Sequence, residues 1–207
     1  MRPIFLLLSG LMYYSVSVAQ SAITLEDIYL HRMYSPKSIA ELRSMQDGMH
    51  YTINDGGKSV VQYAYSNGEK TAQIFHVENT NGVIEKFDGY AFNPEETALL
   101  LSTQREERYR RSAFFTNYVY DLKKKTTTLL SETGKQMYAE FAPAGNKVAY
   151  VIDNNLYYKD LDKNKEVRVT DDGRKNFIIN GGSDWVYEEE FRLVRAFEWS
   201  PDGKKIA

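Results

Sequence analysis

The sequence contains no cysteine, only three histidines and five prolines in 207 residues. The absence of cysteine excludes disulfide bonds, thiolate metal sites, a cysteine nucleophile and the lipid-modified cysteine of a lipoprotein. A formal net charge of −2 gives no reason to expect nucleic acid or an anionic membrane surface as a partner. The chain is 43% hydrophobic, which is too apolar for a disordered protein. We therefore expect a folded domain with an apolar core.

The first 20 residues have the features of a secretory signal. Arg2 supplies a positive charge, residues 4–12 are largely apolar, and Ala19 is a small residue suited to cleavage. The apolar run is much shorter than the ~20 residues that span a bilayer, which argues against an uncleaved anchor. The sequence thus predicts a signal peptide over residues 1–19 and export, to the periplasm or out of the cell, of what would be a bacterial protein.

A short helical segment is expected over residues 20–40. Thr24 can cap the start of the helix, and acidic residues follow in its first turn. Leu25 and Ile28 recur at helical spacing, and Pro36 is expected to end the helix.

Beyond residue 40 the sequence predicts β-strands. Runs of β-branched and aromatic residues alternate with turn residues, and no helical pattern separates them. The predicted strands are residues 59–65, 72–77, 99–102, 114–121, 126–130, 147–152 and 167–170. Asn67-Gly68 and Asn81-Gly82 are each typical of a tight hairpin turn, because Asn-Gly adopts positive φ at little cost.

A proline-led turn recurs in phase along this region. Pro94, Pro143 and Pro201 each follow an aromatic residue that ends one strand, at separations of 49 and 58 residues. A degenerate copy is expected at residues 51–61, with Asp55-Gly56-Gly57 as its turn. Repeats of about 40–50 residues with four short strands each are typical of β-propeller blades, whereas a β-sandwich gives no reason for proline to recur.

The sequence therefore predicts an all-β fold, an incomplete β-propeller over residues 41–207. About three to three and a half four-stranded blades fit into this length, and a closed ring needs at least four. The last repeat stops at Ala207, so we expect the chain to be a fragment of a longer protein.

The usual catalytic motifs are absent from the sequence. It has no nucleophile elbow, zinc-binding histidine helix, phosphate loop or dinucleotide fingerprint. Asp160, Asp162 and Asn164 resemble the start of a calcium loop, but Lys165 replaces the required glycine, so a hairpin turn is expected there.

Two segments differ from ordinary turns. Residues 104–112 carry four arginines and exceed the length of a tight turn, so they are expected to project as a loop.

In the second segment, three consecutive glutamates are flanked by aromatic residues: Trp185, Tyr187, Glu188, Glu189, Glu190 and Phe191. Neighbours on a strand point to opposite faces, so Glu189 and Glu190 can converge only in a helical turn or a bulge. The flanking aromatics are expected to hold such a turn against the protein. Clustered carboxylates repel unless a metal, an arginine or a ligand ammonium lies between them.

These two segments resemble known motifs of the dipeptidyl peptidase IV family. Residues 184–190, Asp-Trp-Val-Tyr-Glu-Glu-Glu, resemble its double-glutamate motif, and residues 109–112, Tyr-Arg-Arg-Ser, resemble its substrate-arginine loop. The resemblance extends over essentially the whole mature chain. It implies an eight-bladed propeller that precedes an α/β-hydrolase domain, and a serine peptidase that removes Xaa-Pro or Xaa-Ala dipeptides from free N-termini.

The resemblance also implies roles for individual residues. Glu189 and Glu190 would bind the α-ammonium of the substrate, and Arg110 would hold the carbonyl of its first residue. The position of Arg110 follows from the match at residues 120–122, and Arg111 stands where the family commonly has histidine.

Other residues would support this site rather than form it. Trp185, Tyr187 and Glu188 are the supporting residues, and no metal or cofactor is expected. The catalytic serine, histidine and aspartate would lie in the missing hydrolase domain, so the 207-residue chain alone should be inactive. The expected partners are peptides with a free N-terminus and proline or alanine at position two, the hydrolase domain, and a second copy in a homodimer.

Two alternatives remain open from the sequence. One is a non-enzymatic periplasmic propeller that serves as a binding or scaffold module. The other is a related prolyl peptidase whose substrate lacks a free amine.

Overall fold

The computed structural model describes residues 23–36, 39 and 41–207. It divides the chain into two units, residues 1–38 and 39–207, each of which is taken by itself. The predicted signal peptide lies outside the described residues. Among the residues that are described, no helix is long and apolar enough to cross a membrane.

The described residues of the first unit contain one short helix, η1 (Glu26–Leu30), which is a single π-helical turn. Thr24 caps it: the Asp27 N–H donates to Thr24 Oγ1 and the Thr24 N–H donates to Asp27 Oδ2, both at 3.1 Å. The prediction that Pro36 ends the helix is wrong. Arg32 already adopts a left-handed conformation with φ of 49°, which no helix can continue.

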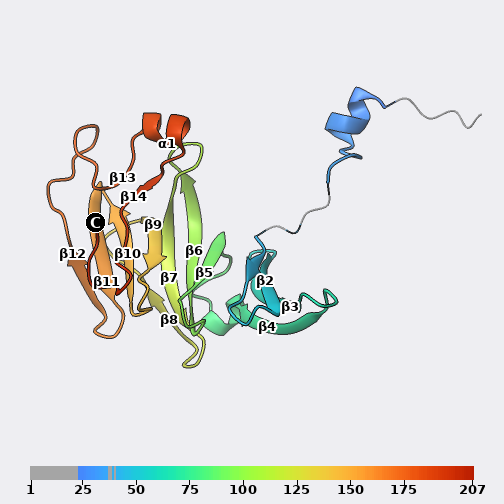
Figure 1. Ribbon diagram of the computed structural model, residues 1–207, viewed down its shortest axis with the longest axis horizontal. Coiled ribbons are helices and arrows are strands. Elements are labelled where there is room, and N and C mark those ends of the chain that lie inside the picture. The colour runs from blue at the N-terminus through green and yellow to red at the C-terminus, as the bar shows by residue number, and fades with distance from the viewer. Residues whose placement is uncertain (1–22, 37–38, 40) are drawn as a thin grey trace, which may run out of the picture. The chain divides into compact units, whose positions relative to one another are not determined.

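The second unit consists mainly of antiparallel four-stranded sheets that follow one another along the chain (Figure 1). The first sheet contains β1 (Arg43–Ser44), β2 (His50–Asp55), β3 (Ser59–Ala64) and β4 (Lys70–His76). The second contains β5 (Gly89–Phe92), β6 (Ala98–Glu107), β7 (Ala113–Asp121) and β8 (Thr126–Leu129). The third contains β9 (Met137–Phe141), β10 (Lys147–Ile152), β11 (Asn155–Asp160) and β12 (Lys165–Arg168). A two-stranded sheet follows, formed by β13 (Gly181–Gly182) and β14 (Arg195–Ala196). The predicted all-β fold with four-stranded repeats is confirmed, and the sheets do not close into a barrel.

The first two strands of each four-stranded sheet are joined by equivalent turns. Pro94 and Pro143 lie in these turns, and Pro201 occupies the same place in the turn that joins Trp199 to Ile206, which form an isolated antiparallel bridge. Each of these turns, including the one in the first sheet, contains a residue with positive φ: Gly48, Glu96, Gly145 and Gly203.

The predicted position of the earliest repeat is wrong. In the first sheet the equivalent turn is formed by residues 45–49, between β1 and β2. Asp55-Gly56-Gly57, which was expected to be this turn, begins the connection between β2 and β3. The displacement arises because β1 has only two residues and therefore shows no recognisable strand pattern.

The two Asn-Gly pairs have different structures. Asn67-Gly68 lies between β3 and β4, as a hairpin requires. Asn81-Gly82 does not form a hairpin; it follows the 3-10 helix η2 (Val77–Thr80), where Asn81 has φ of 53°. A residue that accepts positive φ ends a helix as readily as it turns a hairpin. The chain then continues into β5 of the next sheet.

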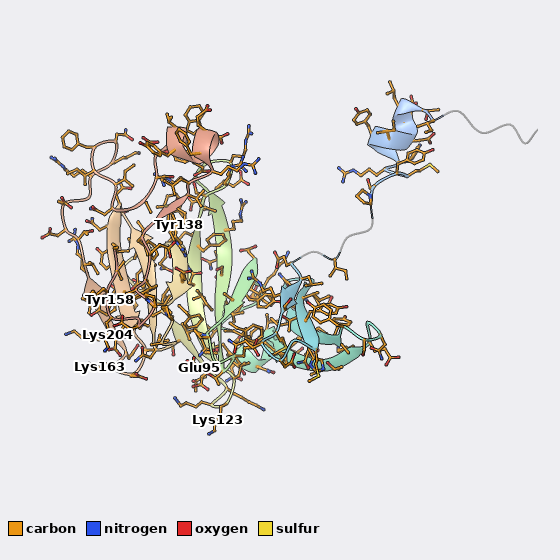
Figure 2. The ribbon with its side chains drawn as sticks, in the orientation of Figure 1. Glu95, Lys123, Tyr138, Tyr158, Lys163 and Lys204 are labelled. Atoms are coloured by element: carbon orange, nitrogen blue, oxygen red, sulfur yellow. The ribbon has the colours of Figure 1, made fainter. Side chains whose placement is uncertain are left out.

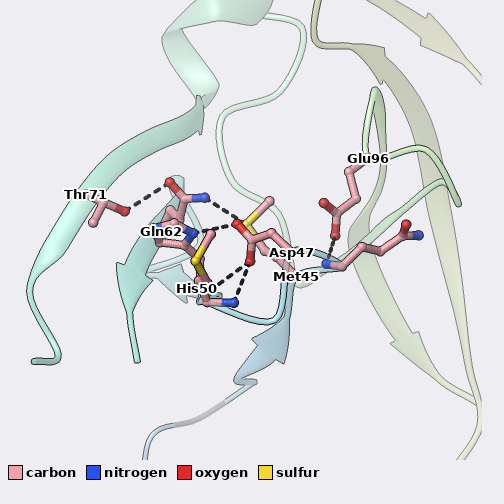
Figure 3. Close-up of polar contacts among 8 residues, drawn as sticks. Met45, Asp47, His50, Gln62, Thr71 and Glu96 are labelled. Atoms are coloured by element: carbon pink, nitrogen blue, oxygen red, sulfur yellow. Dashed lines mark hydrogen bonds and ion pairs between the residues drawn. The ribbon is translucent and has the colours of Figure 1, made fainter. Parts of the chain in front are cut away.

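The first and second sheets are also joined by polar contacts at these turns (Figure 3). The Gln46 N–H donates to Glu96 Oε1 at 2.9 Å, and the Gln46 side chain donates to the Pro94 carbonyl. Beside this link, Asp47 Oδ2 lies 2.6 Å from His50 Nδ1. The hydrogen bond with His50 lowers the pKa of the Asp47 carboxyl below its ordinary value.

The apolar core lies between successive sheets. Leu99 and Leu101 pack toward the first sheet, whereas Leu100, on the opposite face of β6, packs toward the third. Apolar side chains from both sheets fill each interface: Val60, Phe75, Leu99, Leu101 and Tyr120 in the first, and Leu100, Val119, Val148, Tyr150 and Tyr157 in the second. Because both faces of β6 and β10 are covered, these two strands contain continuous apolar runs rather than alternating patterns.

A partly buried hydrogen bond ties β10 to the outer strand of the third sheet. Tyr150 Oη donates to Glu166 Oε2 at 2.6 Å. Burial alone would raise the pKa of Glu166, but hydrogen bonds from Ser131 and Tyr150 outweigh it and lower this pKa. The ionised form of Glu166 is therefore the one that the fold stabilises.

Candidate functional site

The three consecutive glutamates lie on a helix, α1 (Trp185–Phe191), inserted between β13 and β14. Asp184 caps its start by accepting a backbone hydrogen bond at 2.9 Å, and Arg192, with φ of 57°, ends it. Figure 1 shows α1 at one end of the sheets, beside the connection between β6 and β7. Figure 2 shows the polar turns of Lys123 and Lys163 at the opposite end. The helical turn expected from the adjacent glutamates is therefore present.

The arginine-rich segment is the end of a long β-hairpin. Residues 104–112 form the predicted loop only in part, because β6 continues through Gln104–Glu107 and only Arg108–Ser112 form the turn. Gln104 has φ of 53°, and the strand pairing shifts between Thr103 and Glu106. The ladder is interrupted at this bulge and resumes at Glu106 and Glu107, so the two strands pair up to the turn.

Glu188 fastens α1 to the tip of this hairpin. Its side chain is completely buried. Its Oε1 accepts hydrogen bonds from the backbone N–H of Arg111 at 2.6 Å and of Ser112 at 3.0 Å. The sequence predicted only a supporting role for Glu188, since no pattern shows which of three consecutive glutamates turns inward.

The structure brings two of the predicted binding residues together. Arg110 Nη1 lies 3.5 Å from Glu189 Oε2, with the Arg110 side chain 72% exposed and that of Glu189 16% exposed. Glu190 follows on α1 and is exposed. Arg111 is likewise exposed and contributes its backbone N–H to Glu188.

This arrangement suits a ligand with a cationic group beside a hydrogen-bond acceptor. A ligand ammonium about 4 Å from a carboxylate gains ~4 kcal/mol at an effective dielectric constant of ~20. An exposed guanidinium such as that of Arg110 can donate to a carbonyl oxygen. In the described part of the chain, no group of three or more histidine, aspartate or glutamate side chains is placed to hold a metal ion.

The aromatic residues around the glutamates do not hold the helix against the protein. Trp185 is 56% exposed, Tyr187 is 52% exposed and Phe191 is 70% exposed. Tyr187 and Phe191 contact each other instead, with ring centroids 5.5 Å apart. The expectation that these aromatics anchor the turn is therefore wrong for this chain, and the polar side chain of Glu188 does so instead.

The strand leading into α1 packs closely on the third sheet. Gly181 has φ of 75°, and a Cβ atom there would lie 2.8 Å from Val151 Cγ2. At Gly182, a Cβ atom would lie 3.0 Å from the ring of Tyr138, which Figure 2 shows near the α1 end of the sheets. Tyr138 Oη accepts a hydrogen bond from Arg108 Nη1 at 3.5 Å, and burial raises the pKa of this tyrosine. Sequence reasoning missed Tyr138 and Arg108, because only the folded chain brings them under the helix.

Repeated four-stranded sheets, together with an acidic helix locked to an arginine-bearing hairpin, define a protein of the β-propeller type. Residues 93–207 match the family described as the dipeptidyl peptidase IV (DPP IV) N-terminal region. The chain belongs to this family.

Individual relatives agree with this membership. The chain is 35% identical over 178 residues to dipeptidyl peptidase 4 of Trichophyton rubrum, covering 84% of this chain and 22% of the relative. It is 32% identical over 192 residues to the Mus musculus protein named prolyl endopeptidase FAP, covering 90% of this chain and 24% of that relative. The crystal structure of Porphyromonas gingivalis dipeptidyl peptidase 4 is similar with a TM-score of 0.80 and 35% identity, covering 89% of this chain and 27% of that one. The chain thus spans about a quarter of the length of these relatives.

Proposed function

We propose that this chain is the substrate-recognition part of a dipeptidyl peptidase that releases Xaa-Pro and Xaa-Ala dipeptides from free peptide N-termini. Glu189 and Glu190 bind the α-ammonium of the peptide, and Arg110 donates to the carbonyl of its first residue. The observation that carries this proposal is the 3.5 Å approach of Arg110 to Glu189 from a different segment of the chain.

Such a site acts by positioning. Binding the ammonium fixes where the peptide begins, so the second peptide bond always reaches the same place. A serine nucleophile and its partners in the remainder of the full-length protein would cut there, and the 207-residue chain alone would hydrolyse nothing. Two of the relatives are named dipeptidyl peptidase 4, and both are much longer than this chain. Their names and lengths support this division.

The test compares two chromogenic substrates in the full-length protein. Gly-Pro-anilide has a free amine, whereas N-acetyl-Gly-Pro-anilide has the same scissile bond and no cation. We expect kcat/KM for the free substrate to exceed that for the acetylated one by at least about 100-fold, as expected when charge pairing worth ~3 kcal/mol is lost. Equal rates for both substrates would contradict the proposal. An absence of activity on either would favour a binding or scaffold module.

A second candidate function is cleavage within a peptide. The relative named prolyl endopeptidase FAP supports it through its 32% identity over most of this chain. Cleavage of a long N-acetylated peptide after an internal proline, faster than dipeptide release from the same peptide with a free amine, would favour this second function.

We also propose that the protein is exported after cleavage at Ala19. The charged start, apolar run and small residues of the first 20 residues support this. N-terminal sequencing of the mature protein should begin at Gln20, and a mature protein that retains residues 1–19 would contradict it.

A further inference from the structure

Glu188 is the buried member of the glutamate triplet. Its side chain has no exposed surface, whereas Glu189 is partly exposed and Glu190 is exposed. A carboxylate is costly to bury unless hydrogen bonds compensate for the lost water. The groups that contact the Glu188 carboxylate must therefore compensate for its burial.

Both hydrogen-bond donors to Glu188 are backbone groups of the hairpin tip. The Arg111 N–H lies 2.6 Å and the Ser112 N–H 3.0 Å from the same oxygen, Oε1. Bonds to main-chain groups fix the path of the hairpin itself rather than one mobile side chain. The donors also follow directly after Arg110 in the sequence, just as the acceptor directly precedes Glu189.

The direct contact between Arg110 and Glu189 is too weak to set their separation. It is a single 3.5 Å approach by a side chain that is 72% exposed, and such surface pairs contribute little. The aromatic side chains of α1 are exposed and do not replace it. The hydrogen bonds of Glu188 are what join the two segments closest to the binding residues.

We propose that Glu188 is a positioning residue that sets the distance between the arginine and the glutamates that read the substrate ammonium. Its carboxylate does not contact substrate. It holds α1 against the hairpin tip, so that Arg110, Glu189 and Glu190 form one preorganised cluster. This inference rests on the proposed function, because its effect appears as selectivity for a free amine.

The second oxygen of the Glu188 carboxylate takes no part in the anchoring. Glu188 Oε2 and Ser112 Oγ are both buried, and neither has a hydrogen-bond partner among the described residues. Arg108, in the turn of the same hairpin, donates a hydrogen bond to Tyr138 of β9. The two hydrogen bonds to Oε1 are therefore the ones that hold the buried Glu188 side chain against the hairpin tip.

The test measures amine selectivity in the full-length protein. Acetyl-Pro-anilide is Gly-Pro-anilide without its amine, so the ratio of the two kcat/KM values isolates recognition of the ammonium. In Glu188→Ala we expect this ratio to fall at least about 10-fold, since a displacement near 1 Å can cost up to about 100-fold. Hydrolysis of acetyl-Pro-anilide should stay within about threefold of wild type. The control Glu132→Ala, at an exposed glutamate far along the chain, should leave both values unchanged.

The conservative variant separates hydrogen bonding from charge. Glu188→Gln keeps an oxygen that can accept both backbone N–H groups, so its ratio should stay within about threefold of wild type. A ratio that falls equally in the Gln and Ala variants would overturn the proposal, because the charge and not the anchoring would then carry the effect. An equal fall for both substrates would also overturn it, as the expected result of a merely structural role.

Failure of the inference can be told from failure of the proposed function. If wild type shows no preference for the amine, the proposed function fails. If wild type is selective and Glu188→Ala is equally selective, only the role of Glu188 is overturned. Should Glu188→Ala fail to fold, Glu188→Asp replaces it: the side chain is one methylene shorter and cannot keep both bonds, so its ratio must also fall, and an unchanged ratio contradicts the proposal.

Discussion

Replacing Arg110 by alanine removes the guanidinium that lies 3.5 Å from Glu189. Because the Arg110 side chain is 72% exposed, the pair should contribute only about 0.2–1 kcal/mol to the stability of the fold. The thermal midpoint of the full-length protein should therefore change by no more than a few degrees, as is usual for surface substitutions.

The effect of this substitution on activity should be larger. In the proposed complex Arg110 donates a charged hydrogen bond to the substrate, which is worth about 1.5–3 kcal/mol. Since 1.4 kcal/mol corresponds to a factor of ten, kcat/KM for Gly-Pro-anilide should fall roughly 10- to 150-fold. The assay is steady-state hydrolysis, with thermal unfolding measured on the same sample.

Arg111→Ala is the matched control. Arg111 is an exposed neighbour of the same type, and its backbone N–H, which is what Glu188 binds, is retained by alanine. We expect kcat/KM within about threefold of wild type. The reasoning is refuted if Arg111→Ala is the more damaging of the two, or if Arg110→Ala lowers stability by as much free energy as it removes from the transition state.

Three further predictions concern the framework of the site. Gly181→Ala should lower the thermal midpoint and the activity together, because the new Cβ would lie 2.8 Å from Val151 Cγ2 at a positive φ; an unchanged midpoint would count against this packing. Asn93→Ala should destabilise the second sheet by about 1 kcal/mol, because the amide oxygen accepts two backbone hydrogen bonds at 2.8 Å; hydrogen exchange of β5 and β6 should accelerate, and exchange at the wild-type rate would contradict it. The folded state lowers the pKa of Glu166, so its contribution is present above the ordinary value of 4.5 and is lost as the pH falls through the folded pKa. Between about pH 5 and pH 3, Glu166→Gln should therefore lose less stability than wild type, and an equally steep loss would contradict the pKa direction.

The sequence predicts most of the sheets because their determinants are local. Apolar runs and turn residues locate β3, β7 and β10 to within a residue or two, and proline marks three equivalent turns. β11 was not predicted, because its ends are polar and its pairing with β10 depends on a connection of only two residues. β1 and β14 have two residues each, so no pattern can reveal them.

The sequence predicts the binding residues of the site, but it does not show which neighbouring side chains hold them in place. Glu189 and Arg110 lie in motifs that can be recognised in a single sequence, and the structure places these two side chains in contact. Of the three expected supporting residues, Glu188 is buried, whereas Trp185 and Tyr187 are exposed. Which of them turns inward depends on which face of a seven-residue helix meets a hairpin from another part of the chain, and helical periodicity over so few residues does not specify it.

The central claim is that the two glutamates recognise the α-ammonium of a peptide. It is tested most directly by the double variant Glu189→Gln/Glu190→Gln in the full-length protein, assayed with Gly-Pro-anilide and with acetyl-Pro-anilide. We predict that wild type prefers the amine by at least about 100-fold, that the variant loses most of this preference, and that hydrolysis of acetyl-Pro-anilide is nearly unchanged. A double variant that still prefers the free amine as strongly as wild type would contradict the account.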